Sequence, residues 1–385
     1  MLQLRRDIDL GVHLDRLGFD EFWVGEHHST GWEMIASPEL LLAAVGEHTS
    51  RIRLGTGVVS LPYHHPFNVA QRLVQLDHMT GGRVIFGSGP GALPSDAHTL
   101  GIDPMVQRDR QDEAIGVIRR LLAGEERFSY ESEWFTLRDA QLQILPLQEE
   151  MPFAVASMIS PSGMTLAGKY GIGVLSIGSM STEGIQALPL QWSFAEESAV
   201  EHGQQVDRCD WRVVMAFHIA ETREQARAEA RAGLHRWHTE YTVGTLQRPG
   251  AVAYGDPDET LEALTSQSAA VVGTPDDLVE AIRRTNEISG GFGTVIGFAH
   301  DWANREATLR SWEMVARYVI PEICGLLTNM RASQRYVIDH RESFERATKA
   351  VLSKIMENER AAEALKVTTQ QRAAIPAHHA PTQVR

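Results

Sequence analysis

Short apolar segments alternate with longer amphipathic ones through most of this 385-residue chain, and this alternation restricts the fold more than any other feature. The apolar segments are rich in β-branched residues and continuously apolar, as is typical of parallel strands buried on both faces. Repeated strand–helix units connect through right-handed crossovers, so the pattern predicts an α/β fold with a parallel sheet. Seven strands are predicted, at residues 21–25, 52–60, 83–87, 152–157, 173–177, 212–220 and 294–299. A closed (β/α)8 barrel needs eight strands, one more than this count.

Two stretches interrupt the alternation. Residues 127–148 are expected to form an irregular excursion with a hairpin, and residues 247–272 an insertion rich in Gly, Pro, Ala and Asp. Long connections of this kind are more often functional lids than accidents. We therefore expect a barrel domain over residues 1–325 that carries both insertions. A helical extension over residues 326–365 and a disordered tail over residues 366–385 are expected to follow it.

The composition excludes several classes of protein. An apolar share of 43% and a charged share of 22% are those of a globular chain. The formal net charge of −14 argues against a nucleic-acid partner, since phosphate binding needs basic clusters. No apolar run approaches a membrane span, and the charged N-terminus does not resemble a signal peptide. Cys209 and Cys324 make neither a disulfide framework nor a metal cluster, so we expect a reduced, soluble, cytoplasmic protein.

The first candidate site lies in the stretch DEFWVGEHHSTG, where Glu26, His27 and His28 directly follow a predicted strand. Side chains at the C-terminal ends of barrel strands line the active site, so these three residues are candidate catalytic groups. Adjacent strand residues point to opposite faces, so His27 and His28 would not easily share a metal, and we expect none. The alternative is a structural histidine that is hydrogen-bonded at a strand end.

A second candidate follows the next strand, in GTGVVSLPYHHP. Gly55 and Gly57 have no side chains, which often marks the close approach of a ligand or another backbone. The alternative is a proline-containing turn before a helix, with Pro66 near its first position. This interpretation holds for Pro66, whereas the glycines and His65 stay open between the two.

The third candidate is the glycine-rich stretch VIFGSGPGALPSDAHTLG. Small residues directly after a strand favour the close approach of a flat or phosphorylated ligand. Gly87, Gly89 and Gly91 recur at every second position, which does not match the G-x-G-x-x-G fingerprint of dinucleotide-binding folds.

The fourth candidate is ASMISPSGMTLAGKYG, where a strand ends near Ser157 and Ser160-Pro161-Ser162 opens a helix. Free N–H groups and the positive end of the helix dipole make such a start an anion site, to which serine hydroxyls can add donors. The alternative is an ordinary serine N-cap followed by proline.

In three stretches the chain resembles the bacterial-luciferase-like, flavin-dependent monooxygenase family: GFDEFWVGEHHST, RIRLGTGVVSLPYHHPFNVAQRLVQLDHMTGGRVIFGSGPG and GTPDDLVEAIRRTNEISGGFGTVIGF. The similarity runs over residues 10–325. Within the family, SPSGMTLAGKYGIGVLSIG and FAHDWANREATLRSWEMVARYVIPEI most resemble the limonene 1,2-monooxygenase branch.

This resemblance implies a (β/α)8 barrel that binds reduced FMN or FAD, which a separate NAD(P)H-dependent reductase supplies. It places His27, within Glu26-His27-His28, where the family has its catalytic histidine. It also implies a non-proline cis peptide at Gly57–Val58, beside the isoalloxazine ring. The residues implied at the flavin and its phosphate are Gly57, Val58, His65, Ser88, Gly89, Gly91, Ser157, Ser160 and Ser162.

Two features depart from the family pattern. Pro90 stands where luciferases have an arginine that contacts the flavin phosphate, so the charge partner must come from elsewhere. Family members also begin with a strand that precedes the first helix, whereas this chain begins at that helix. The first strand is then the missing one, which we attribute to a start codon assigned too late or to a shortened chain. N-terminal mass measurement on the native protein tests this.

The resemblance further implies the chemistry. Reduced flavin and O2 give a C4a-hydroperoxide, which epoxidises an alkene when neutral and attacks a ketone when deprotonated. His27 is expected to control that proton. The nearby carboxylate of Glu26 is a candidate for tuning His27, but the sequence does not say whether Glu26 points toward it. The expected substrate is small and apolar, such as a terpene, and a homodimer is expected by family analogy. The alternatives are a deazaflavin-dependent dehydrogenase on the same barrel, a non-catalytic flavin-binding partner subunit, and a metal hydrolase, which the ligand spacing disfavours.

Overall fold

The computed structural model describes residues 3–158, 160–248 and 250–364. The chain divides into two compact units, Met1–Ile323 and Cys324–Arg385. Among the described residues, none of the helices has the length and apolarity needed to cross a membrane. The predicted tail at residues 366–385 lies outside the described residues.

Nine strands form the sheet of the first unit, and all the strand pairs in this sheet are parallel. Neighbouring strands follow the order β1-β2-β4-β7-β8-β9-β10, with β3 beside β4 and β11 beside β9. The strands are β1 (Glu21–Val24), β2 (Arg53–Thr56), β3 (Val59–Ser60), β4 (Val84–Gly89), β7 (Phe153–Ser157), β8 (Gly173–Ser176), β9 (Trp211–Ile219), β10 (Val271–Gly273) and β11 (Thr294–Phe298). The predicted α/β class with a parallel sheet is confirmed.

Two details of the sheet differ from the prediction. The strand predicted at residues 52–60 is split into β2 and β3, and the peptide bond between Gly57 and Val58 lies in the break and is cis. The short strand β10 was not predicted, because three residues at the end of a polar insertion carry too little periodicity to be recognised.

The sheet curls into an open barrel. Among the described residues β1 pairs only with β2, and β11 pairs only with β9, so the ring of strands is open between β1 and β11. Exposure follows this opening: all nine residues of β9 are buried, whereas all five residues of β11 are half-buried.

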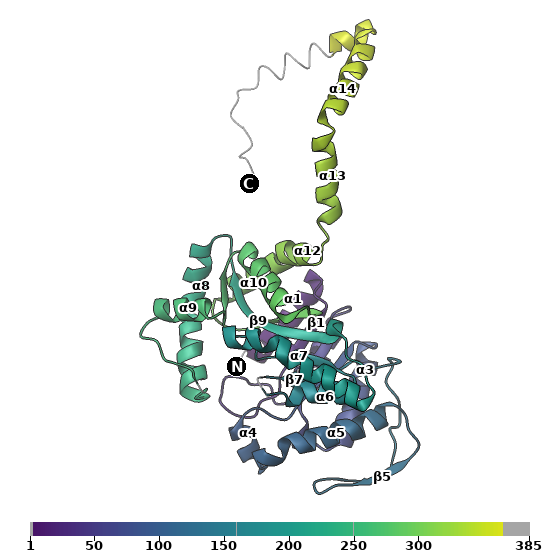
Figure 1. Ribbon diagram of the computed structural model, residues 1–385, viewed down its shortest axis with the longest axis vertical. Helices are drawn as coiled ribbons and strands as arrows, with labels where there is room; N and C mark the ends of the chain where they lie inside the picture. Colours follow the sequence, from purple (N-terminus) through teal and green to yellow (C-terminus); the bar gives the residue numbers. More distant parts are fainter. Residues whose placement is uncertain (1–2, 159, 249, 365–385) are drawn as a thin grey trace. The chain divides into compact units, whose positions relative to one another are not determined.

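Helices cover the outside of the sheet (Figure 1). Contacts between neighbouring helices link them into a ring, which the strands do not form. Helix α1 closes it by packing against α2 on one side and α11 on the other, and Lys169 links α6 to Asp112 of α5. The ring helices are α1 (Gln3–Leu17), α2 (Pro38–Glu47), α3 (Pro66–Thr80), α5 (Gln107–Leu122), α6 (Ser162–Tyr170), α7 (Thr182–His202), α10 (Pro275–Ser289) and α11 (Arg305–Met314), which continues as the π-helix η5 (Val315–Val319) and α12 (Ile320–Ile323).

Among the described residues, both interruptions contain regular secondary structure. Residues 127–148 contain the expected hairpin, which consists of β5 (Phe128–Glu131) and β6 (Thr136–Ala140). The carboxylate of Glu113 in α5 anchors the hairpin, because it accepts hydrogen bonds from three side chains of the hairpin. Residues 247–272 contain a helix that was not predicted, α9 (Pro257–Ser266), capped by Asp256 and packed on α8 (Arg223–Arg236).

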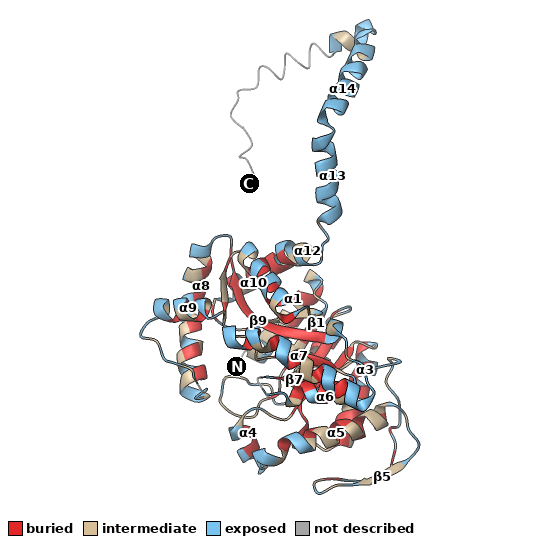
Figure 2. Ribbon diagram, viewed as in Figure 1, coloured by how far each residue is buried: buried red, intermediate tan, exposed pale blue. Residues whose placement is uncertain are grey.

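The core of the first unit lies between the sheet and the helix ring, and Figure 2 shows it as continuous red along β9 and the inner faces of the helices. The second unit contains α13 (Thr328–Asp339) and α14 (Arg341–Met356), and no residue of either helix is buried.

Candidate active site

A buried carboxylate organises the first part of the site. Glu26 follows β1 and is only 3% exposed. Its Oε1 lies 2.8 Å from Nε2 of His28 and 2.7 Å from Nε2 of His64, and its Oε2 accepts a hydrogen bond of 2.7 Å from the backbone N–H of Ser60. Residues from the ends of β1 and β3 and from the segment after the 3-10 helix η1 (Leu61–Tyr63) thus converge on one carboxylate.

These contacts keep Glu26 ionised. Burial alone would raise the pKa of its carboxyl group, but the hydrogen bonds from His64, Ser60 and His28 outweigh burial and lower the pKa below its ordinary value. A buried carboxylate that accepts three hydrogen bonds holds its neighbours firmly.

His27 lies between two other carboxylates. Its Nδ1 is 3.3 Å from Oδ2 of Asp96, and its Nε2 is 3.0 Å from Oε2 of Glu33. Asp96 is 2% exposed, comes from the short helix α4 (Pro94–Thr99), and also accepts a hydrogen bond from the backbone N–H of His28. Each ring nitrogen of His27 therefore has a carboxylate that can accept its proton.

Tyr241 extends this arrangement. Its hydroxyl donates a hydrogen bond of 2.6 Å to Oε2 of Glu33, and its ring stacks on Trp32 with the centroids 5.4 Å apart. Burial and the charge of Glu33 raise the pKa of Tyr241, so it stays a hydrogen-bond donor at neutral pH. Tyr241 lies in the π-helix η4 (Trp237–Thr245), an element that is rare and often found at functional sites.

The sequence left open whether Glu26 points toward His27, and in the structure its carboxylate contacts other histidines. Adjacent residues of an extended segment point to opposite sides, so Glu26 meets His28 and His64 while His27 meets Asp96 and Glu33. The four partners His64, Asp96, Glu33 and Tyr241 were not predicted, since they come from a turn, a short helix, a loop and a π-helix and carry no motif in the sequence.

His65 is not brought to this cluster. Its Nδ1 accepts a hydrogen bond of 3.3 Å from the backbone N–H of Phe67, so it caps α3, and its ring contacts the edge of Phe135. Its neighbour His64 reaches Glu26 instead.

Glycines let the strands pack closely here. A Cβ atom at Gly55 would lie 2.4 Å from the indole of Trp23, and one at Gly89 would lie 2.5 Å from Val58. Gly91 has a φ of +86°, which side chains rarely adopt, and faces the Tyr63 hydroxyl. The missing side chain at Gly55 thus makes room for the indole of Trp23, a residue of the protein itself.

Two serine hydroxyls at strand ends lack partners. Ser88 in β4 is fully buried and Ser157 at the end of β7 is 1% exposed, yet the described residues offer neither Oγ a hydrogen bond. Buried polar atoms are almost always paired, so unpartnered ones mark a place where a ligand supplies the missing contact. This fits a polar, flat group such as a flavin.

The start of α6 offers further donors. The helix begins at Ser162 with Pro161 at the N-cap position, so no side chain caps its free N–H groups. Ser160 and Ser162 lie with their hydroxyls 2.9 Å apart, and Nε of Arg108 donates a hydrogen bond of 3.3 Å to Oγ of Ser162. Arg108, from the first turn of α5, brings to this helix start the positive charge that Pro90 cannot supply.

No group of three or more His, Cys, Asp or Glu side chains suited to a metal occurs in residues 3–158, 160–248 and 250–364.

Comparison with known proteins identifies the family of the chain. Residues 2–291 match the family described as luciferase-like monooxygenase. The chain is 46% identical to 4-hydroxyprotoasukamycin monooxygenase of Streptomyces nodosus subsp. asukaensis, over 88% of this chain and 92% of that protein. It is 47% identical to limonene 1,2-monooxygenase of Rhodococcus erythropolis, over 84% of this chain and 82% of that protein.

Solved structures agree as well. The oxygenating constituent of 3,6-diketocamphane monooxygenase from Pseudomonas putida, a type II Baeyer-Villiger monooxygenase in complex with FMN, superposes with a TM-score of 0.71. It is 28% identical to this chain and covers 83% of this chain and 92% of its own. The chain therefore belongs to the luciferase-like monooxygenase family of oxidoreductases.

Proposed function

We propose that this chain is the oxygenase component of a two-component system, which takes reduced FMN or FAD from a separate NAD(P)H-dependent reductase and adds one oxygen atom of O2 to a small apolar alkene or ketone. The observation that carries the proposal is His27, held between Asp96 and Glu33 at the end of β1, with unpartnered serine hydroxyls at two other strand ends. Relatives named for limonene and diketocamphane, both terpenoids, support the substrate class.

Bound reduced flavin supplies the two electrons that allow one oxygen atom of O2 to enter the substrate while the other leaves as water. The protein's own residues divide the remaining work. Ser160, Ser162, Arg108 and the N–H groups at the start of α6 would hold the flavin phosphate. The unpartnered hydroxyls of Ser88 and Ser157 would donate to polar atoms of the flavin, and Gly57, Val58, Gly89 and Gly91 would line its site.

His27 moves the proton in this proposal. Its Nε2 faces Glu33 and its Nδ1 faces Asp96, so the imidazole is fixed in orientation and can pass a proton in either direction. Glu26 has a positioning role, because it holds His28 and the backbone of Ser60 in place. The ring of Trp32, stacked on Tyr241, helps to keep water from this side of the site.

The test is an anaerobic titration with reduced FMN, reduced FAD and reduced deazaflavin, followed by 18O2 with limonene or a cyclic terpene ketone. We expect a flavin to bind and one 18O atom to appear in the product. Preference for the deazaflavin without oxygen uptake would replace the proposal with a dehydrogenase. Flavin binding without any product from either substrate class would instead indicate a non-catalytic partner subunit.

His27→Asn examines the catalytic role directly. Loss of a general acid–base costs about 10²–10⁴-fold in rate, and we expect a decrease of that size with reduced-flavin binding retained. His48→Asn is the matched control, since His48 is exposed at the C-terminal end of α2. Equal rates for His27→Asn and the wild type would remove His27 from the mechanism.

A further inference from the structure

Aromatic rings form a continuous row beside the candidate site. The row starts at Tyr241, which donates a hydrogen bond to Glu33, the carboxylate that faces His27. The ring centroid of Tyr241 lies 6.3 Å from that of Trp237 in the same π-helix η4, and Trp237 lies 6.1 Å from Phe298, the last residue of β11. Ring centroids at these distances are in packing contact. The row therefore connects the surroundings of His27 with the C-terminal end of β11.

The side chain of Phe298 points into the barrel. A Cβ atom at the preceding residue, Gly297, would lie 2.5 Å from the ring of Trp312 in α11, a helix outside the sheet. Successive strand residues point to opposite faces, so Phe298 faces inward. Its partner in β9, Ala216, faces inward as well, because the adjacent Phe217 packs on the same outer tryptophan. Ala216 carries only a methyl group, so the inner surface at this end of the sheet belongs mainly to Phe298.

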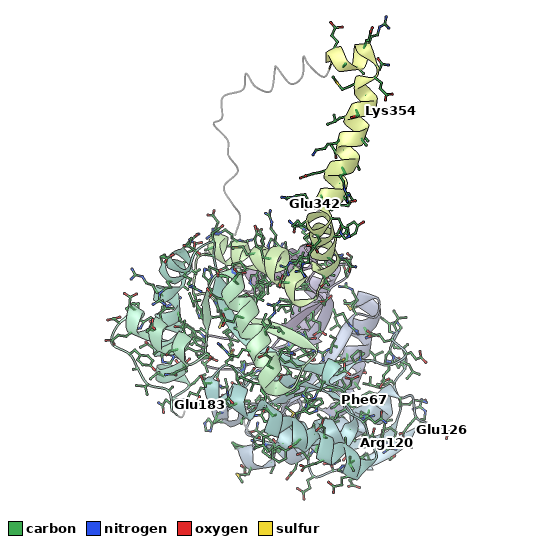
Figure 3. All side chains as sticks on the ribbon, turned by 45° about the horizontal axis from the view of Figure 1, so that its top comes forward. Phe67, Arg120, Glu126, Glu183, Glu342 and Lys354 are labelled. Atoms are coloured by element: carbon green, nitrogen blue, oxygen red, sulfur yellow. The ribbon has the colours of Figure 1, made fainter. Side chains whose placement is uncertain are left out.

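A third large apolar residue reaches the same place from another element. Met180 lies in the turn between β8 and α7 and packs against the apolar cluster that includes Ala216, as do Trp237 and Phe298. Figure 3 labels Glu183, in the first turn of α7 just after Met180. Parallel strands of a barrel end at one face, so the ends of β8, β9 and β11 bring these side chains together at its C-terminal mouth.

These side chains are only half-buried, although they lie at the inner side of the barrel mouth. The open edge beside β11 accounts for the exposure of Phe298, but Trp237 and Met180 belong to other elements. Trp302, whose ring centroid lies 5.9 Å from that of Trp237, is by contrast only 2% exposed. The row thus has a buried support and an accessible front, which is typical of a site for an apolar ligand.

The rings of the row meet at an angle. The plane of Trp237 makes an angle of 58° with the ring of Phe298 and of 54° with the ring of Tyr241. Two faces inclined in this way form a corner, which contacts a compact ring skeleton on two sides at once. A linear chain can lie against only one of these faces, and it loses more conformational freedom on binding. The shape therefore favours cyclic skeletons.

We infer that Trp237, Phe298 and Met180, here called the apolar wall, bind the carbon skeleton of the substrate and select compact cyclic skeletons over linear chains. The inference rests on the proposed function, in which His27 moves the proton, because the wall meets the partners of His27 through Tyr241. The unpartnered serine hydroxyls lie on β4 and β7, whereas the wall lies at β8 to β11. Substrate and flavin would therefore not compete for the same surface.

Isothermal titration calorimetry of the full chain with camphor and 2-decanone tests the wall, both without flavin and with reduced FMN under anaerobic conditions. The two ketones have the same number of carbon atoms, in a bicyclic and in a linear skeleton. We expect camphor to bind the wild type at least about tenfold more tightly, since one methylene contact in an apolar pocket is worth about 10–200-fold. Phe298→Ala and Trp237→Ala should each weaken camphor binding by at least about tenfold and 2-decanone binding by less.

A filling variant and a matched control complete the set. Phe298→Trp adds volume to the corner, so it should exclude camphor while 2-decanone still binds. Phe128→Ala should change neither affinity, because Phe128 is a half-buried phenylalanine of the β5–β6 hairpin, under the guanidinium of Arg120. Figure 3 shows Arg120 well apart from Glu183. The readout is the ratio of the two affinities, since a variant that unfolds loses both ketones alike.

Binding of neither ketone to the wild type, equal affinities for the two, or a ratio that none of the three wall variants changes would overturn the inference. The proposed function is judged separately, by the incorporation of 18O. An oxygenated product together with an unchanged ratio would remove the wall and leave the proposed function standing. Selective binding of camphor without any oxygenated product would do the reverse.

Discussion

Arg212 of β9 and Glu21 of β1 form a two-pronged ion pair inside the open barrel, although 191 residues separate them in sequence. Both donor–acceptor distances are 2.7 Å, and the side chains of Arg212 and Glu21 are only 7% and 11% exposed. Trp23 completes the group, since its Nε1 donates to Glu21 and the Arg212 guanidinium lies over its ring. The two strands have no hydrogen-bonded pairing with each other among the described residues, so side chains alone connect them.

Arg212→Met should lower the free energy of unfolding by about 3–5 kcal/mol, because removing one partner leaves a nearly buried charge unpaired. The double variant Glu21→Leu/Arg212→Met should recover much of this loss. Urea unfolding monitored by tryptophan fluorescence measures both. The exposed pair Arg227–Glu262 is the control, where Arg227→Ala should cost less than about 1 kcal/mol. A double variant as unstable as Arg212→Met would contradict this account.

Glu26→Gln should cost about 2–3 kcal/mol, since a neutral amide cannot accept hydrogen bonds from two imidazoles and a backbone N–H at once. The pKa of Glu26 is lowered, so the unfolded chain binds its proton more readily than the folded one. The contribution of Glu26 to stability is therefore complete above its ordinary pKa of 4.5 and is lost as the pH falls through the lower folded value. Urea midpoints measured from pH 7 to pH 3 should fall more steeply below pH 4.5 in the wild type than in Glu26→Gln; parallel curves would contradict the prediction.

Tyr241→Phe keeps the ring stacked on Trp32 but removes the hydrogen bond to Glu33. Glu33 then holds His27 less firmly, and we expect kcat to fall about tenfold, less than the loss expected from removing His27 itself. The Kd for reduced flavin should not change. Tyr254→Phe is a matched control, because Tyr254 stacks on His238 away from Glu33. A change in flavin Kd with kcat unaffected would place Tyr241 at the flavin and not beside His27.

Arg108→Ala should weaken binding of reduced FMN by about 10–100-fold, the worth of one charge-assisted hydrogen bond. Binding of reduced riboflavin, which has no phosphate, should be unaffected, and Arg108→Lys should recover part of the loss. Anaerobic fluorescence titration measures all three, with Arg227→Ala as the control. An equal loss for riboflavin would show that Arg108 supports the fold of the loop and does not bind phosphate.

Much of the sheet could be predicted because buried parallel strands carry an unbroken apolar signal that needs no information about distant residues. The break at Gly57–Val58 inside the strand predicted at residues 52–60 was expected as a cis bond only from the family resemblance. Helix α9 was not predicted, since the Gly- and Pro-containing residues around it resemble a loop.

Less of the candidate site than of the sheet could be predicted from the sequence. Glu26, His27 and His28 are adjacent in sequence and could be identified as a group, but adjacency does not say which way each side chain points. Their partners Glu33, Asp96 and Tyr241 come from a loop, a six-residue helix and a π-helix, and only the fold brings them together. The sequence gives no reason to choose between the adjacent residues His64 and His65. The turn formed by η1 decides that His64 reaches Glu26.

The opening between β1 and β11 makes stability uneven around the ring. Strand β9 lies between neighbours on both sides and is buried throughout, so its amide protons should exchange with solvent only when the whole barrel unfolds. Strand β11 has one strand neighbour and half-buried side chains along its length, so local opening suffices to release its amides. The amides of β11 should therefore exchange faster than those of β9. On gentle heating, β11, the last strand in the sequence, should be the first part of the barrel to detach.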